Sequence, residues 1–510
     1  MSLFRNTPKD PESLLDQTLY TVPGTGTKIT WADAVEGTLI LGSTGSGKSS
    51  GPGRHAALAM LKQGFGFCIL SAKADGRARW EGYAKETGRS NDLVIFNKAN
   101  DLKFNFLQYE MTRSGEGAGE LLNIVNALMN LNEQNRVYQS GSGGKDDEKF
   151  WDNSLRRMIS RTVNLLKLTG EEVSIHNMNE IVTGRFEKDD MQLYTHLKDT
   201  ITTTEKIDHH IRRDARQKMD TWVKNSYFLR TIEKLQKTDL QNDHALNDAL
   251  LVLNYWIRDF PKVGEKTTSI IVESFLAIIE PFLNDGILKR QFSQGLDEQL
   301  LPENIINKRK IVIIDYPVKE YGLAGIYASI IYKTVFMTAM ERRKITDETD
   351  PRPVALWIDE YQSFCNPMAD TQFQATARSS WVATVYITQN INNIYFVMGN
   401  NMAEARAKSL LGNLNLKYFA SNADFDTNQW ASNMIGQHYV HKDDLRISDD
   451  LKYSKSKSHE LRPRIRPDFF TTLKTGRKAN GYIVDAVVFK PGKTWGNEGH
   501  NLAVVEFKQC

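Results

Sequence analysis

The sequence predicts an α/β fold in which a mostly parallel central sheet is interrupted by an inserted all-α domain. Two observations carry this prediction: apolar runs of strand length recur in both halves of the chain, and the interval between them has helical spacing. Most runs lack strict alternation of apolar and polar residues, as expected of strands buried on both faces of a parallel sheet. They span residues 37–41, 66–70, 93–96, 311–314, 354–358, 382–387 and 416–420.

The interval from residue 109 to residue 288 differs from the sequence on either side. Its apolar residues recur with the period of an amphipathic helix, as in Leu121, Val125 and Leu128. Within it we expect a flexible polar loop at residues 140–147 and a helix from Phe150 to Leu166. The predicted organisation is an N-terminal segment (1–29), a discontinuous α/β domain (30–108 and 289–510) and an inserted all-α domain (109–288).

The last part of the chain divides into two regions. Residues 452–466 are polar and basic, and we interpret them as a mobile surface loop in preference to a DNA contact. Regular structure is expected again at residues 481–490 and 502–507, where two apolar runs predict a terminal hairpin.

Composition limits the class of protein. The 510 residues are 40% hydrophobic and 25% charged, which argues against wholesale disorder, and a net charge of +3 does not by itself indicate a nucleic-acid partner. The three cysteines have no spacing typical of disulfide frameworks or zinc sites. No signal peptide is evident, and the longest apolar stretch, residues 325–340, is interrupted by Lys333. We therefore expect a cytoplasmic protein that does not span a membrane.

The segment after the first apolar run has the complete pattern GxxxxGK[ST]. An apolar run precedes it and an alanine-rich helical stretch follows, which is the order that a phosphate-binding P-loop requires. Glycines allow the tight turn that points backbone N–H groups at phosphates. Lys48 would neutralise phosphate charge and the Ser49 hydroxyl would ligate Mg²⁺. The predicted nucleotide-binding residues are Gly42, Ser43, Thr44, Gly45, Ser46, Gly47, Lys48 and Ser49.

A second motif places two carboxylates at the end of the apolar run 354–358. Asp359 would hold the Mg²⁺ water shell and Glu360 would polarise the attacking water, an arrangement that suits ATP hydrolysis. The competing metal candidate, Asp315, also follows an apolar run but has Tyr316 and Pro317 after it instead of a second acid. We favour Asp359 and interpret 311–314 as a neighbouring core strand.

Two further residues complete the predicted chemistry. Gln389 ends the apolar run 382–387 after Thr388, where an amide can orient water or sense the γ-phosphate. Arg378, upstream of that run, is a candidate arginine finger that would act in the neighbouring subunit of a ring. Taken alone, a polar residue at a strand end such as Gln389 usually belongs to a simple turn, and an arginine such as Arg378 is usually a residue on a helix surface.

Together these motifs resemble the type IV secretion coupling proteins of bacterial conjugation, which are RecA-like relatives of the FtsK and HerA DNA translocases. The resemblance is spread over most of the chain, although Ser71 and Ala72 stand where the family usually has Asp-Pro. The matching segments are 67–75, 104–107, 150–151, 387–389, 411–413, 418–424 and 435–436.

The resemblance implies a RecA-like fold, a homohexameric ring, ATP and Mg²⁺ as cofactors, and DNA in a central channel. It implies contacts with a relaxase–DNA complex and a secretion channel. It also assigns nucleotide and metal binding to Lys48 and Ser49, metal binding and catalysis to Asp359 and Glu360, γ-phosphate sensing to Gln389 and the inter-subunit finger to Arg378. Family members usually begin with transmembrane helices, which we do not find here, so docking at the inner membrane would require a partner.

Three functions remain open at this stage. The leading one is an ATP-hydrolysing DNA motor of the coupling-protein type. The second is an FtsK- or HerA-like DNA translocase of a mobile element, packaging or defence system. The third is a protein-recruitment platform switched by nucleotide, which has less need of the water-activating Glu360.

Overall fold

The computed structural model describes residues 11–129, 145–204, 207–240, 242–399, 403–447, 453–495 and 500–509. The chain forms two compact units, of which the first joins residues 1–100 to 301–510 and the second comprises 101–300. The second unit therefore extends beyond the predicted insertion of 109–288 at both ends.

The first unit is built on one nine-stranded sheet with the strand order β13-β12-β9-β3-β8-β7-β4-β6-β5. The strands from β9 to β5 are all parallel, and β12 and β13 add an antiparallel edge. Every predicted apolar run is one of these strands, and the terminal hairpin is β12 paired with β13, so the α/β prediction is confirmed. The bounds are β3 (Thr38–Leu41), β4 (Gly66–Ser71), β5 (Leu93–Phe96), β6 (Ile311–Ile314), β7 (Val354–Asp359), β8 (Val382–Thr388), β9 (Leu416–Ala420), β12 (Ile483–Phe489) and β13 (Leu502–Lys508).

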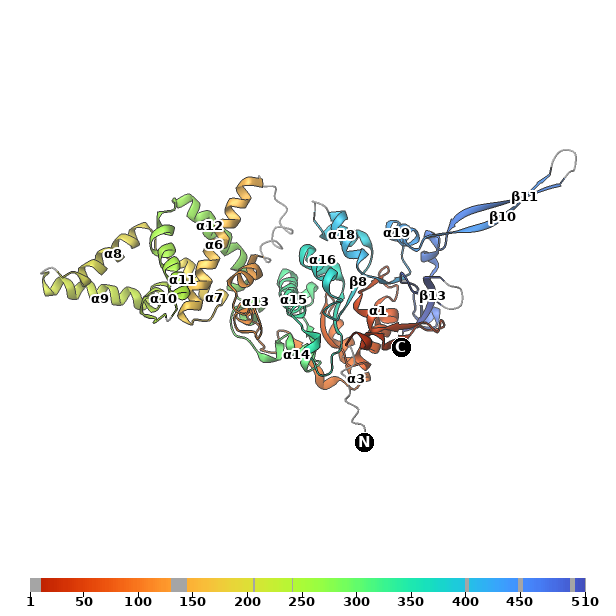
Figure 1. Cartoon of the computed structure of the whole chain (residues 1–510), viewed down its shortest axis with the longest axis horizontal. Helices are drawn as coiled ribbons and strands as arrows, with labels where there is room; N and C mark the ends of the chain where they lie inside the picture. The colour runs from red at the N-terminus through yellow and green to blue at the C-terminus, as the bar shows by residue number, and fades with distance from the viewer. Residues whose placement is uncertain are drawn as a thin grey trace, which may run out of the picture. The chain divides into compact units, whose positions relative to one another are not determined.

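Helices cover both faces of this sheet, which explains why its strands are apolar throughout. On one face, α1 (Trp31–Val35), α2 (Arg54–Lys62) and α3 (Gly76–Glu86) contribute to a single buried apolar cluster with alternate strand residues. On the other, α16 (Pro367–Thr376) reaches the sheet through Gln374, which accepts a 2.7 Å hydrogen bond from Thr384 of β8. α1 and α16 lie on opposite sides of β8 in Figure 1.

The long helix α15 (Val318–Glu341) is the one described helix whose length and hydropathy would allow it to cross a membrane. However, 61% of its most apolar window is buried inside the protein. Lys333 on this helix is fully buried and forms a 2.6 Å ion pair with the equally buried Asp370 of α16. The lysine that interrupts the apolar run is thus part of the packing between α15 and α16, as in a core helix of a folded domain.

The N-terminal residues and the remaining helices complete the first unit. β1 pairs with β2 as an antiparallel hairpin, and the apolar side chains of Leu15, Leu19 and Val22 enter the same cluster as α1 to α3. The remaining elements are η1 (Pro11–Asp16), β1 (Thr18–Thr21), β2 (Lys28–Thr30), η2 (Ser49–Gly53), η3 (Ser90–Asp92), α14 (Glu303–Asn307), η7 (Ile345–Asp347), η8 (Tyr361–Ser363), α17 (Ile391–Val397), α18 (Ala403–Gly412), α19 (Phe425–Ile435), η9 (Pro467–Thr472) and η10 (Lys478–Asn480).

The prediction of a mobile loop at residues 452–466 is wrong. β10 (Gln437–Ile447) and β11 (Tyr453–Pro463) form a long antiparallel hairpin that is a sheet of its own. Its backbone ladder supplies the hydrogen bonds, while side chains such as Tyr439 and Leu461 remain exposed. The sequences of these two strands lack the regular alternation of apolar and polar residues that signals a strand.

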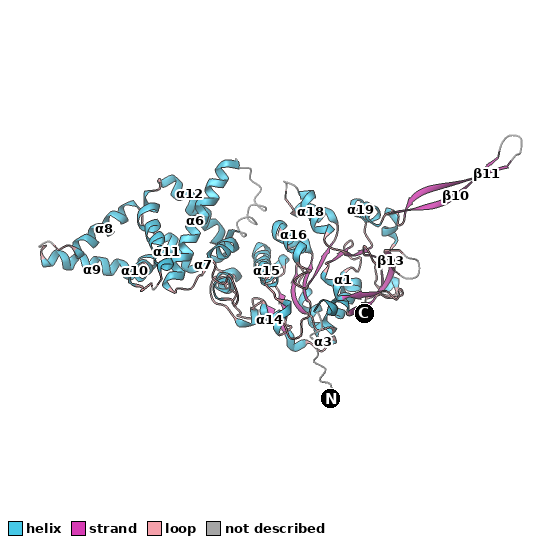
Figure 2. Ribbon diagram, in the orientation of Figure 1, coloured by secondary structure: helices cyan, strands magenta, loops and turns pink. Residues whose placement is uncertain are grey.

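The second unit is helical, and its described residues contain no strand beyond an isolated bridge between Phe104 and Leu296 (Figure 2). α6 begins at Lys145, earlier than predicted, so the end of the expected polar loop is helical, while residues 140–144 lie outside the described residues. The helices are α4 (Phe106–Thr112), a helix over 121–129, α6 (Lys145–Thr169), α7 (Ile175–Thr183), α8 (Lys188–Thr202), α9 (His209–Asn225), α10 (Tyr227–Lys237), α11 (Asp243–Asn254), η4 (Tyr255–Asp259), η5 (Phe260–Lys262), α12 (Glu265–Leu283), α13 (Ile287–Phe292) and η6 (Glu298–Leu300).

Candidate nucleotide site

The P-loop joins the end of β3 to η2 and α2. Gly45 and Gly47 have φ angles of 78° and 83°, in the left-handed region that side chains disfavour. A Cβ atom on Gly47 would also lie 2.4 Å from Cγ2 of Val484 on β12. Both glycines are therefore required by the turn, and Gly47 is also required by the close packing of the loop against β12.

The loop carries a buried cation. Lys48 is 4% exposed and forms no ion pair with any residue in the described part of the chain. Burial lowers the pKa of its ammonium group, and the negative charge of Glu360 partly opposes this shift. The Ser46 hydroxyl is likewise buried and without a hydrogen-bond partner among the described residues. Buried polar groups of this kind are costly unless a ligand completes them, and a phosphate group matches both in charge and in hydrogen bonding.

The predicted metal ligands lie next to each other. The Ser49 hydroxyl is 3.3 Å from Oδ2 of Asp359, which ends β7 with a side chain that is 6% exposed. A hydroxyl and a carboxylate are oxygen ligands of the type that Mg²⁺ prefers, so the residues present fit this ion. In the structure, Arg79 of α3 holds the same Asp359 oxygen at 3.1 Å.

Glu360 follows in a left-handed backbone conformation, with φ 57° and ψ 56°. Non-glycine residues rarely adopt it, and such strain is concentrated at functional sites. Its carboxylate forms a 2.5 Å ion pair with Lys73 and accepts hydrogen bonds from Gln362 at 2.8 Å and Gln389 at 3.3 Å. Burial raises the pKa of Glu360, but the hydrogen bond from Lys73, with Gln362 and the charge of Lys48, outweighs burial and lowers it. The carboxylate is thus held ionised, as a base requires.

The fold gathers most of the predicted residues because parallel strands end at the same edge of a sheet. Gln389 reaches Glu360 from the end of β8, the strand between β3 and β7. Arg378 does not join them: it is exposed in the turn before β8, at the opposite end of a strand about 20 Å long. Its role in a neighbouring subunit remains a prediction.

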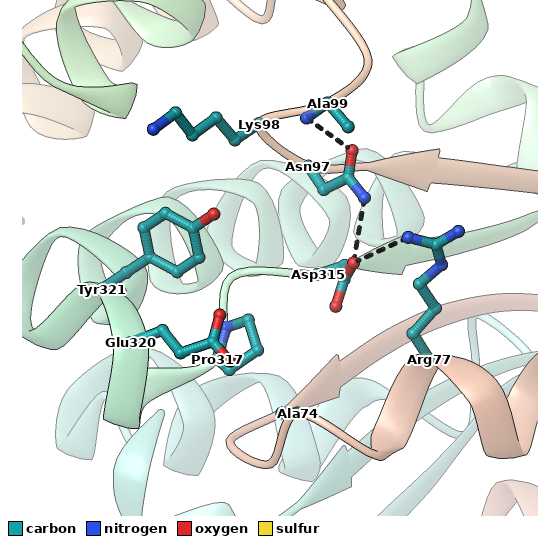
Figure 3. A pocket seen from close by; sticks show the side chains of 9 residues that line it. All are labelled: Ala74, Arg77, Asn97, Lys98, Ala99, Asp315, Pro317, Glu320 and Tyr321. Carbon is teal, nitrogen blue, oxygen red and sulfur yellow. Dashed lines mark hydrogen bonds and ion pairs between the residues drawn. The ribbon is translucent and has the colours of Figure 1, made fainter.

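Asp315 lies in a separate pocket, shown in Figure 3. Its carboxylate accepts a 3.0 Å hydrogen bond from Asn97 and lies 3.7 Å from a guanidinium nitrogen of Arg77. The pocket has a volume of about 500 Å³. It opens at the sheet edge where two adjacent strands lead into helices on opposite faces, β4 into α3 and β6 into α15. The geometry therefore favours Asp359 over Asp315 as the partner of Ser49.

Several contacts of this site have no local sequence signal. Asn422 accepts a hydrogen bond from the Ser43 hydroxyl at 3.1 Å and donates to the backbone oxygen of Gln389 at 3.0 Å, which ties the loop to the end of β8. Arg79 and Gln362 contact the acid pair in a similar way. Asn422 lies in the segment 418–424 that carries the family resemblance, whereas Arg79 and Gln362 could only have been suspected from their positions after predicted strands.

Part of the chain is similar to a known protein family. Residues 353–475 match the family model TraG-D_C, described as the TraM recognition site of TraD and TraG. Over these residues the chain is similar to the TraG and TraD coupling proteins. No curated protein sequence matches the chain significantly.

Solved structures show that the similarity of fold extends over the whole chain. The bacterial conjugative coupling protein TrwBdeltaN70 matches with a TM-score of 0.58 and 15% identity, covering 98% of this chain and 90% of that one. TrwB with the non-hydrolysable ATP analogue ADPNP gives 0.57 and 14%, with coverages of 98% and 91%. TrwB with ADP and Mg²⁺ gives 0.52 and 16%, with 98% and 92%. The RecA-like fold predicted for this chain is therefore the fold of a conjugative coupling protein.

Proposed function

We propose that this protein is an ATP-hydrolysing DNA motor that links a relaxase–DNA complex to a type IV secretion channel. The observation that carries the proposal is the buried Lys48, which has no ion-pair partner among the described residues, in a P-loop that faces the acid pair Asp359 and Glu360. A site of this kind fits a nucleotide polyphosphate better than a neutral ligand. The TraG-D_C match over residues 353–475 supports the coupling task.

Each residue then has a role that its position allows. Lys48 and the N–H groups of the P-loop would bind the terminal phosphates, while Ser49 and Asp359 would hold Mg²⁺. When bound, the ion would neutralise charge on the phosphates. Glu360, kept ionised by Lys73, would accept a proton from the attacking water, and Gln389 beside it would orient that water.

The assembly and partners follow from the same proposal. A homohexamer would place Arg378 of one subunit near the phosphates bound by the next, and DNA would be gripped through its backbone without base readout. The family description names recognition of another protein, so residues 353–475 are where we expect a protein partner to bind. The motor would act in the cytoplasm, docked at the inner membrane through such a partner.

The test measures ATP hydrolysis by the full chain without DNA, with single-stranded DNA and with double-stranded DNA, at increasing salt. We expect DNA to stimulate hydrolysis and salt to weaken that stimulation, because phosphate contacts release counterions. Lys48→Ala should lose nucleotide binding, Glu360→Gln should bind nucleotide but hydrolyse it about 100-fold more slowly, and Lys408→Ala, exposed on α18, should behave as the wild type. Equal hydrolysis with and without DNA, together with a mass that never exceeds the monomer, would contradict the motor.

A further inference from the structure

The segment before β12 lies directly against the P-loop. A Cβ atom on Gly45 would be 2.9 Å from Nη2 of Arg477, and one on Gly47 would be 3.3 Å from the backbone oxygen of Thr475. Residues more than 400 positions away in sequence thus form one wall of the nucleotide site. The guanidinium of Arg477 is beside the loop that would surround the phosphates.

The backbone of Arg477 has an unusual conformation. Its φ of 64° and ψ of 174° fall in a region that is populated almost entirely by glycine. Such a conformation persists in another residue only when the surroundings impose it, and it is found most often at active sites and ligand clamps. An arginine at this position therefore carries a conformational cost that glycine would avoid.

Specific hydrogen bonds hold this conformation against the P-loop. The N–H of Arg477 donates to Oε1 of Gln509 at 2.6 Å, and its backbone oxygen accepts from the N–H of Tyr482 at 2.8 Å. The amide of Gln509 also donates to the hydroxyl of Ser50, in η2, at 2.8 Å. Gln509 thereby joins the backbone of Arg477 to the element that directly follows the phosphate-binding loop.

The side chain of Arg477, by contrast, is exposed and has no ion pair or hydrogen bond within the described part of the chain. The two arginines of α3 differ from it. Arg79 is paired with Asp75 and Asp359, and Arg77 is paired with Glu81. Arg477 is a positioned cation at the nucleotide site whose charge no described residue balances.

We propose that Arg477 binds the phosphate chain of the nucleotide held by the P-loop of the same subunit. A planar guanidinium donates paired hydrogen bonds to phosphate oxygens, which matches the ligand that the loop and Lys48 would hold. Arg477 is then a second cationic contact of the nucleotide, supplied by the segment before β12. The inference rests on the proposed function only in taking a nucleotide as the ligand.

The experiment measures equilibrium binding of a fluorescent ATP analogue to the full chain, with and without Mg²⁺. Arg477→Ala should weaken binding about tenfold or more, the size expected when a hydrogen bond to a charged group is lost. Arg477→Gly should weaken it as much, although glycine suits this backbone, and Arg477→Lys should keep part of the affinity. Lys478→Ala, the matched control on the adjacent exposed lysine, should bind as the wild type does. Inorganic tripolyphosphate should compete less effectively for Arg477→Gly than for the wild type, since the lost contact is with phosphate.

Several outcomes would overturn the inference. If Arg477→Gly binds as the wild type does while Lys48→Ala does not bind, Arg477 has no phosphate contact and the proposed function stands. If Arg477→Ala alone loses affinity and the glycine variant keeps it, the effect belongs to the backbone. If Lys478→Ala loses as much as Arg477→Ala, the segment acts only as a diffuse basic surface. A wild-type protein that binds no nucleotide would instead refute the proposed function.

Thermal unfolding of each variant shows whether it is folded. If Arg477→Ala is not folded, Arg477→Gly provides the test.

Discussion

Two aspartates at the same edge of the sheet illustrate how position decides chemistry. Asp359 ends β7 and Asp315 directly follows β6, each after a buried apolar strand. Asp359 faces Ser49 of the P-loop and is followed by the strained Glu360. Asp315 faces Asn97 and Arg77 in the pocket of Figure 3.

The difference follows from the order of the strands. β7 is separated from β3 only by β8, so its end lies close to the P-loop, whereas β4 and β7 both stand between β6 and β8. The segment after β4 contributes to both places, because Arg79 contacts Asp359 and Arg77 contacts Asp315. An acid after an apolar strand is therefore only a candidate metal ligand until its distance from the P-loop is known.

The largest expected effect tests this comparison directly. Asp359→Asn should reduce the kcat for ATP hydrolysis by about 100-fold or more, because it removes the negative charge that would hold the metal. Asp315→Asn, a matched change at the other end of the comparison, should leave kcat within about twofold. Steady-state hydrolysis and thermal unfolding of both variants provide the measurement. Equal loss in the two variants would show that the pocket of Asp315 takes part in the reaction.

The strands that flank the two sites also differ, because only one of them carries a buried charged residue. β9, beside the P-loop strand, carries the buried Lys417, whereas β5, on the side of Asp315, is apolar throughout. Burial, with the charge of Lys490, lowers the pKa of Lys417 to about 8. Because the unfolded chain keeps a higher pKa, the folded state binds fewer protons, and stability should rise as pH increases from about 8 towards the ordinary lysine value.

Lys417→Met should therefore stabilise the protein at pH 7, by on the order of 1–2 kcal/mol, since the cost of burying the charge exceeds the hydrogen bond that is lost. The gain should shrink as pH rises through 8 to 10, where the wild-type lysine becomes neutral in the folded protein. Chemical denaturation at several pH values measures this, and Lys508→Met, exposed on β13, is the control. A gain that does not change with pH would mean that packing, not charge, is responsible.

The smallest expected effect separates the two arginines of α3. Arg79 holds the Asp359 oxygen that would bind the metal, so Arg79→Ala should raise the apparent affinity for Mg²⁺ in the presence of nucleotide by about fivefold. Arg77→Ala should leave that affinity unchanged, because its nearest acids are Glu81 and Asp315. Titration of Mg²⁺ against a fluorescent nucleotide gives both values. Weaker Mg²⁺ binding by Arg79→Ala would indicate that Arg79 supports the metal site instead of competing for it.

Much of this site could be predicted from the sequence because its signals are local. The P-loop pattern, the run that ends in Asp359 and the position of Gln389 each depend on a few consecutive residues. The ion pair of Lys73 with Glu360 joins strands that are adjacent in the sheet but almost 290 residues apart in sequence. No local sequence pattern indicates which strands become neighbours, so this contact could not be predicted from the sequence.

Two segments have regular structure that the sequence does not predict. The β10–β11 hairpin was missed because its stability depends on backbone pairing, with side chains such as Tyr439 left exposed, and strand prediction relies on buried faces. α6 was predicted to begin at Phe150 because the polar residues before it resemble a loop, although Lys145 is already helical. In both cases polar residues form a helix or strand without the periodic spacing of apolar residues from which such elements are predicted.

The sequence by itself determined the α/β class, the phosphate-binding loop and the identity of the acids that could act with it, because glycine spacing and apolar runs restrict the local backbone. Only the tertiary structure decided that Asp359 and not Asp315 meets Ser49, and that Arg477 lies against Gly45. The physical reason is that charges interact over a few ångströms whatever their separation along the chain, and it is the order of strands in the sheet that brings them within that distance.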